Sequence, residues 1–258
     1  MPETIWFRDD SRPRRPRLSR DRIVAAAVAL LDAEGVPGFS MRALAARLRA
    51  GTMSLYEYVQ SKEDVLDLAL DEVFGEIALS EGPTWRETVV RQLTRSRAVM
   101  RRHPWVPALT ATRPLIGPNA LAGSRLFYST LAAAGLTGPD LAAAVGTLSS
   151  YVNGYVAAEN TWWTTVRTPA ADAAIRTRVA SFLSAHATEL SQQAHVTDAD
   201  FDRSFRRGLT IILDGIESRL PPRPADPRTT RRTAPPATKP AADRPSTAAT
   251  RTDDARDT

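Results

Sequence analysis

The chain of 258 residues has no cysteine, which excludes disulfides, thiolate catalysis and zinc sites built on cysteine. It also lacks any run of 18 apolar residues, so no membrane-spanning helix is predicted. Its first residues do not contain the long apolar core of a signal peptide. Since a chain without cysteine suits a reducing compartment, we expect a cytoplasmic protein.

Histidine and lysine are scarce as well. The three histidines, His103, His186 and His195, show neither metal-ligand spacing nor a nucleophile motif nearby, so we predict no catalytic site and no metal site. Only two of the 34 basic residues, Lys62 and Lys239, are lysines. Because alanine is abundant too, the arginine content fits a coding bias and is weak evidence for phosphate binding. The sequence contains no glycine-rich phosphate loop, and we expect neither a cofactor nor an enzyme.

Charge and proline set the two ends of the chain apart from its middle. The net charge is +5; residues 1–62 hold 11 basic and 7 acidic residues, residues 63–220 hold 15 and 17, and residues 221–258 hold 8 and 5. Alternating prolines predict a basic, flexible arm over residues 1–17, which either contacts DNA phosphates or a minor groove or is an unstructured leader. Eight of the 19 prolines fall in the last range, which is predicted to be a disordered tail.

The residues between these ends show helical periodicity without strand-like alternation, which predicts an all-α fold. Ser19, Ser40 and Ser61 stand where helix N-caps are expected, and Gly35 ends the first apolar pattern. These signals predict three short helices and a connecting fourth over about residues 19–80.

Longer helices are predicted in the rest of the chain. They lie near residues 84–102, 118–134, 138–165, 170–191 and 198–220, with one short helix between His103 and Pro118. We therefore expect a small N-terminal domain over residues 18–64 and a larger helical domain over residues 65–220.

Two short helices joined by a tight turn are indicated within residues 40–59. Leu44 and Leu48 on the first helix, and Leu55 and Val59 on the second, form two apolar stripes that can close on each other. The outward face of the second helix and its flanks carry hydrogen-bonding, apolar and basic tips: Arg42, Thr52, Met53, Tyr56, Glu57, Tyr58 and Lys62. Such a face suits the major groove of DNA, so the pattern indicates a helix-turn-helix that binds DNA.

The last predicted helix carries one continuous apolar face. Its members are Phe201, Phe205, Leu209, Ile212, Ile216 and Leu220. Gly208 and Gly215 lie near this face, where missing side chains let another helix come close. The face therefore serves either core packing within the chain or a subunit interface.

Several segments of the chain match the sequence pattern of a known protein family. The N-terminal region resembles the tetracycline-repressor (TetR) family of bacterial transcriptional regulators, through Leu18–Ile23, Ala26–Leu31, Glu34-Gly35, Phe39–Ala45, Leu55-Tyr56, Val59 and Lys62. Thr112-Arg113-Pro114, Gly135-Leu136-Thr137 and Phe205–Ile216 are similar to the C-terminal domain of the tetracycline-repressor subgroup.

The resemblance implies an all-helical homodimer whose N-terminal domains read a palindromic operator. A small effector bound in the larger domain releases the DNA, and the family usually represses transcription. The dimer bundle would be formed by about residues 138–165 and 198–220. The positions that touch bases in the family correspond to Arg42, Thr52, Met53, Tyr56 and Glu57. Those at or near phosphate contacts correspond to Ser40, Met41, Tyr56, Tyr58 and Lys62. We add Ser54, their neighbour on the helix, to the predicted DNA-binding residues.

Two positions depart from the family pattern. Arg49 stands where the family often has glycine, and we expect Gly51 to take over the strained backbone conformation. Glu57 stands where an aromatic residue can occur; it either accepts a hydrogen bond from cytosine N4 or is a solvated surface residue. An alternative function is therefore a helical small-molecule or partner-binding protein without specific DNA binding.

The effector pocket is expected among the middle helices. Its candidate lining residues are Trp85, His103, Trp105, Arg113, Phe127, Tyr128, Asn153 and Trp162. The aromatic members of this set serve either the pocket or the core. Leu109 stands where a histidine would help hold a magnesium-chelated drug, so a tetracycline–magnesium ligand is not supported and the effector identity stays open.

Overall fold

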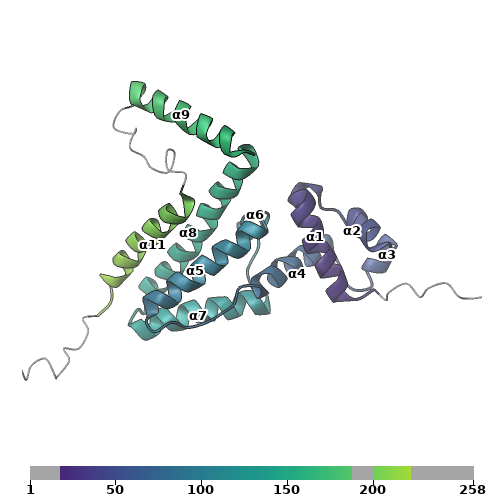
Figure 1. Ribbon diagram of the computed structural model, residues 1–258. Helices are drawn as coiled ribbons and strands as arrows, with labels where there is room; N and C mark the ends of the chain where they lie inside the picture. Colours follow the sequence, from purple (N-terminus) through teal and green to yellow (C-terminus); the bar gives the residue numbers. More distant parts are fainter. Residues whose placement is uncertain (1–17, 188–199, 222–258) are drawn as a thin grey trace, which may run out of the picture. The chain divides into compact units, whose positions relative to one another are not determined.

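The computed structural model describes residues 18–187 and 200–221 (Figure 1). Within these ranges every regular element is an α-helix, which confirms the predicted fold class. The expected basic arm at residues 1–17, His195 and all of the expected tail except Pro221 lie outside the described residues.

The helices lie close to their predicted positions. Their bounds are α1 (Arg20–Gly38), α2 (Met41–Leu48), α3 (Thr52–Leu55), α4 (Lys62–Gly75), α5 (Trp85–Arg102), α6 (Val106–Thr110), α7 (Pro118–Ala134), α8 (Gly138–Thr165), α9 (Pro169–His186) and α11 (Phe201–Glu217). We call residues 18–64, which hold α1 to α3 and the start of α4, the head, and the described residues from 65 to 221 the body. The predicted helices near 84–102, 118–134 and 138–165 match α5, α7 and α8 to within one residue at each end.

Serine caps set the starts of the helices in and next to the head. The hydroxyl of Ser19 accepts from the backbone N–H of Arg22, and that of Ser40 accepts from Ala43. Ser61 caps α4 in the same way, because its hydroxyl accepts from the N–H of Asp64 at 3.1 Å. Local side-chain chemistry therefore explains why these helices begin where the sequence predicts.

The core of the head continues into α4. Its fully buried side chains include Ile23, Ala27 and Leu31 of α1, together with Leu44 and Leu55 of the next two helices. On α4 the buried positions are Val65, Leu66, Ala69, Leu70 and Val73. One hydrophobic core thus joins the head to the body through α4.

In the body, α5, α7, α8 and α11 pack alongside one another (Figure 1). The apolar face of α11 packs against α8, where the hydroxyls of Tyr151 and Tyr155 donate to the carbonyls of Phe205 and Phe201 at 2.8 and 2.7 Å. A Cβ at Gly208 would collide with the hydroxyl of Tyr151, so close approach explains this glycine. Gly215 has open space instead. Most of the predicted apolar face therefore serves the core of this chain.

A buried ion pair ties α5 to α8 and α11. The guanidinium of Arg97 donates to both carboxylate oxygens of Glu159 at 2.9 Å, and both side chains are more than nine-tenths buried. A third bond joins Arg97 to Asp202 at 2.6 Å. The guanidinium also lies over the ring of Phe205, 5.0 Å from its centroid. Three helices that are distant in sequence thus share one charged cluster.

Candidate nucleic-acid interface and ligand cavity

The two apolar stripes of the predicted helix-turn-helix are buried. Leu44, Leu55 and Val59 are at most 4% exposed, while Leu48 is partly buried. The regular part of the second helix, α3, is shorter than predicted, because it ends at Leu55 and continues as a turn through Tyr58. Closing these stripes leaves one face of α3 and its turn for contact with another molecule.

That outward face contains the predicted DNA-contacting residues. Met53 is 78% exposed, Tyr56 is 43% exposed and Glu57 is exposed as well. Thr52, Ser54 and Tyr58 are partly buried at its edges. The face therefore offers an apolar thioether and hydroxyls, which suit base edges and phosphates, and one carboxylate, which suits a donor such as cytosine N4.

Basic side chains flank this face. Arg42 is exposed on α2. Lys62 is the first residue of α4, and its ammonium lies 5.7 Å from the ring centroid of Phe39. The sequence prediction of the contact residues did not include Arg47, in the last turn of α2, and Arg49, at its C-cap, which are also exposed. Their position in and next to the turn of the motif was the signal that could have identified them. All four cations suit a polyanion.

The turn between α2 and α3 corrects one expectation. Arg49 itself adopts the left-handed conformation, with φ 53° and ψ 40°, and its N–H bonds back to the carbonyls of Ala45 and Ala46. Gly51 has φ −73° and ψ 144°, which any residue adopts. The prediction that Gly51 takes over the strained conformation is therefore wrong, because the C-cap of α2 falls two residues earlier.

The start of α4 holds a carboxylate next to Lys62. A hydrogen bond from the hydroxyl of Ser61 lowers the pKa of Asp64, and a second from the N–H of Gln60 at 2.8 Å lowers it further. This carboxylate also caps the first turn of α4. The end of the loop between α3 and α4, directly before Lys62, is therefore fixed by local bonds.

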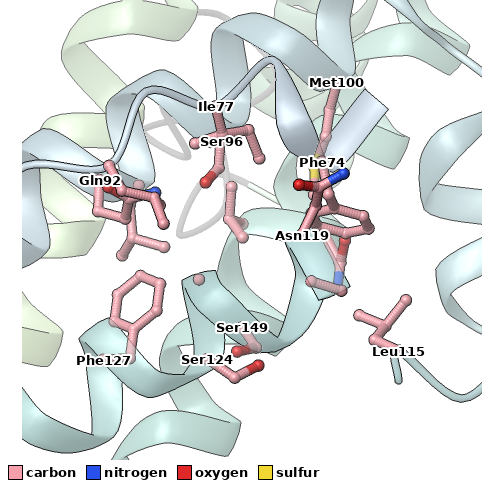
Figure 2. Close-up of a pocket in the computed structure, with 16 residues that line it drawn as sticks. Phe74, Ile77, Gln92, Ser96, Met100, Leu115, Asn119, Ser124, Phe127 and Ser149 are labelled. Atoms are coloured by element: carbon pink, nitrogen blue, oxygen red, sulfur yellow. The ribbon is translucent and has the colours of Figure 1, made fainter. Parts of the chain in front are cut away.

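A cavity lies among α4, α5, α7 and α8 in the body. It encloses roughly 600 Å³ of space between atoms, part of it open to solvent. Its lining residues are Phe74, Ile77, Leu79, Gln92, Leu93, Ser96, Met100, Leu115, Asn119, Ala120, Gly123, Ser124, Phe127, Ser149, Val152 and Asn153. Figure 2 shows Gln92, Ser96 and Ile77 along one side, and Phe127, Ser124 and Ser149 along the other.

Two of the predicted ligand-binding residues, Phe127 and Asn153, belong to this lining. The other five lie elsewhere. Trp85 packs against the core, and the indole of Trp162 donates to Asp172 at 2.7 Å. Tyr128, considered with them, is 43% exposed and is outside the lining too.

The remaining three of the five bond to α1 and α4. His103 places Nδ1 2.8 Å from Asp32 and Nε2 3.2 Å from Glu76, and the indole of Trp105 donates to Asp32 at 2.7 Å. Arg113 forms ion pairs with Glu63 and Asp67 of α4. His103, Trp105 and Arg113 therefore lie outside the lining of this cavity, and carboxylates of neighbouring helices bind their side chains.

The sequence prediction missed most polar residues of the lining. Gln92 and Ser96 stand four residues apart on α5, next to buried Val89 and Leu93. A polar residue that interrupts an apolar helix face was the one available signal. The rest of the lining comes from separate helices that only the tertiary fold brings together.

Among residues 18–187 and 200–221, no group of three His, Asp or Glu side chains is arranged to hold a metal ion. None of the described helices combines the length and apolarity that crossing a membrane requires.

Two family models match the chain. The model described as "Bacterial regulatory proteins, tetR family" matches residues 23–69. The model described as "Tetracyclin repressor-like, C-terminal domain" matches residues 79–220, which is more than half of the chain. The two matches follow each other along the sequence as the head and body do.

Similar proteins give the same picture. The chain is 42% identical over 221 residues to an HTH-type transcriptional regulator of Saccharopolyspora erythraea, covering 83% of this chain and 92% of the relative. It is 41% identical over 160 residues to the HTH-type transcriptional repressor DrrR1 of Streptomyces coeruleorubidus, covering 59% and 58%. Among solved structures, ActR of Streptomyces coelicolor in complex with actinorhodin matches with a TM-score of 0.68 and 28% identity, covering 79% of this chain and 98% of ActR.

Proposed function

The chain belongs to the TetR family of bacterial transcriptional regulators, and from this premise we propose that it is a repressor that binds palindromic operator DNA as a homodimer in the cytoplasm. A small-molecule effector, bound in the larger domain of residues 65–220, releases the DNA-binding domain of residues 18–64 from the operator. The family consists of transcription regulators rather than enzymes.

The exposed face of α3 and its turn is the observation that carries this proposal. Met53, which is 78% exposed, stands on this face between Thr52 and Ser54, with the cations of Arg42 and Lys62 at its flanks. We assign base contacts to Arg42, Thr52, Met53, Ser54 and Glu57, and phosphate contacts to Tyr56, Tyr58 and Lys62. The phenols and the ammonium group suit phosphate oxygens, whereas the short side chains and the thioether can reach base edges.

Open surfaces on α8 and α11 support the homodimer. A Cβ added at Gly146 or Gly154 on α8, or at Gly215 on α11, would meet nothing within 4 Å in this chain. Ile211 of α11 is 68% exposed. Small residues beside an exposed apolar side chain allow a second copy to pack its helices closely. A two-fold dimer can place two heads on half-sites roughly 34–36 Å apart.

Contacts of α4 support a route from the effector to the head. Phe74, at the C-terminal end of α4, and Ile77, two residues beyond that end, both line the cavity. Glu63 and Asp67, near its N-terminal end, form ion pairs with Arg113. A ligand that displaces one end of this 14-residue helix would tilt the other end, which packs on the head. ActR, whose structure is similar to this chain, was crystallised in complex with actinorhodin, which supports a small-molecule effector.

Titration of the purified protein with the DNA upstream of its own gene, at several salt concentrations, tests the proposal. We expect a clear preference over random duplex and an affinity that falls steeply as salt rises, because phosphate contacts release counterions. No preference over random duplex, or an affinity that does not change with salt, would contradict the proposal. That result would favour a helical ligand-binding or partner-binding protein without specific DNA binding.

A further inference from the structure

The lining of the cavity contains no charged side chain. Its polar members are amides and hydroxyls only: Gln92, Ser96, Asn119, Ser124, Ser149 and Asn153. A charged ligand would find no counter-ion among these groups and would lose its hydration on entry. The cavity therefore favours an uncharged molecule.

The three amides of the lining differ in their bonds. The amide nitrogen of Asn119 donates to the carbonyl of Asp71 at 3.1 Å, and the amide oxygen of Asn153 accepts from the hydroxyl of Thr110 at 3.2 Å. Gln92 is only 2% exposed, and its Oε1 has no hydrogen-bond partner among the residues that the structure describes. A buried carbonyl oxygen without a partner destabilises a fold. A donor on a bound molecule would satisfy it.

The surroundings of Gln92 suggest how a ligand would lie. Figure 2 shows Gln92 across the cavity from the ring of Phe127. Leu93, Met100 and Val152 add further apolar surface to the lining. A ligand can thus bury a mainly apolar body against these side chains while one polar group reaches Gln92.

We propose that Gln92 determines effector specificity, and that the effector is an uncharged, mainly apolar molecule whose hydroxyl or N–H group donates a hydrogen bond to Oε1 of Gln92. The inference rests on the proposed effector-binding function and specifies the chemistry of that same site. Discrimination follows because a ligand without the donor leaves this oxygen buried and unpaired.

Three related fluorescent probes test the inference on the full chain without DNA. N-phenyl-1-naphthylamine is uncharged and has one N–H donor. Its N-methyl derivative lacks the donor, and 8-anilino-1-naphthalenesulfonate adds a negative charge. We expect the first probe to bind about tenfold more tightly than its N-methyl derivative, since one unpaired buried acceptor typically costs about that factor. The sulfonate keeps its N–H group, and we expect it to bind more weakly than the first probe because its charge would lose hydration without gaining a counter-ion. Equal affinities for the charged and uncharged probes would overturn the inference.

Substitutions on α5 separate a ligand-binding role of Gln92 from a structural one. Gln92→Met, with Gln92→Leu as a second variant, removes the amide and should abolish the preference for the N–H probe over its N-methyl derivative. Both variants should keep or raise the Tm of the ligand-free protein, because no internal hydrogen bond is lost. A preference that survives in both variants would overturn the inference.

Thr88, one turn earlier on α5, provides the matched control. Its hydroxyl is buried but accepts from the N–H of Gly82 at 2.7 Å and donates to the carbonyl of Thr84 at 3.0 Å. Thr88→Val should therefore lower the Tm and leave the probe preference intact. Because these titrations contain no DNA, failure of the inference is distinguishable from failure of operator binding.

Discussion

The head and the body build their candidate sites in opposite ways. In the head, the candidate contact residues are nearly consecutive, from Thr52 to Tyr58, and they lie on the surface. In the body, the cavity is lined from four helices, and two of its facing residues, Gln92 and Phe127, are far apart in sequence. A contiguous site follows from local sequence, whereas an enclosed site follows from how helices pack.

The two regions are also held in place differently. Serine caps and one hydrogen-bonded carboxylate position the helices of the head and the start of α4. The body relies on contacts between distant residues, above all the ion pair of Arg97 and Glu159. Burial raises the pKa of Tyr151 to about 12, so its hydroxyl stays protonated and keeps its bond to α11. The comparison predicts different responses to mutation.

The largest effect is expected from breaking the buried ion pair of the body. Glu159→Ala leaves the guanidinium of Arg97 buried beside only one remaining carboxylate, so we expect a loss of about 3–5 kcal/mol in the free energy of unfolding. Chemical denaturation measures this loss. Glu57→Ala, at an exposed position of the head, is the control and should leave stability unchanged. A loss below about 1 kcal/mol for Glu159→Ala would remove the contrast between the regions.

Mutations on the surface of the head should change DNA binding instead of stability. Lys62→Ala should weaken binding to all duplexes about equally and reduce the slope of affinity against salt by about one. Thr52→Ala and Met53→Ala should alter which operator sequence is preferred, by about 1–3 kcal/mol for a base contact. Competition titrations with variant duplexes distinguish these two effects. An unchanged affinity for Lys62→Ala would refute the assigned phosphate contact.

The turn of the head offers a smaller effect of opposite sign. Arg49→Gly should raise the free energy of unfolding by about 1 kcal/mol, because glycine adopts the left-handed conformation without strain. Gly51→Ala should be close to neutral, since its backbone is ordinary and the nearest neighbour of an added Cβ is the hydroxyl of Ser54 at 3.7 Å. Thermal unfolding of both variants checks this pair. A neutral effect of Arg49→Gly together with a clear loss of stability in Gly51→Ala would show that the strain sits at Gly51 instead.

The smallest effect concerns acid stability, where head and body should behave alike. The hydrogen bond from Ser61 lowers the pKa of Asp64, and that from Arg97 lowers the pKa of Asp202. A carboxyl with a lowered pKa binds fewer protons in the folded state, so its stabilisation is present above about pH 4 and is lost as the pH falls further. Asp64→Asn and Asp202→Asn should each flatten the decline of Tm below that pH. An unchanged decline in both variants would contradict these assignments.

The sequence predicted nearly all structural features of the head but only part of the lining of the cavity. The caps Ser40 and Ser61 and the buried stripe residues act within a few residues of themselves, so their pattern is visible along the chain. The left-handed Arg49 escaped because residue type alone favours glycine there. These features depend on residues close together in the sequence, so the sequence predicted most of them.

The cavity could not be derived in the same way. His103, Trp105 and Arg113 have the chemistry of ligand-binding residues, yet carboxylates on α1 and α4 bind them. Those partners are separated from them by tens of residues in sequence. Gln92, which no motif marks, lines the cavity because of where α5 packs. Residue type therefore suggested candidates, and only tertiary contacts decide among them.

The central claim is that two heads of one dimer place their α3 faces in successive major grooves of an operator. A hydroxyl-radical footprint of the protein on its upstream DNA tests this most directly. We predict two protected patches related by a two-fold axis, with centres one helical turn of about 10–10.5 base pairs, or a whole multiple of it, apart. A single protected patch, or protection without any sequence preference, would contradict the claim.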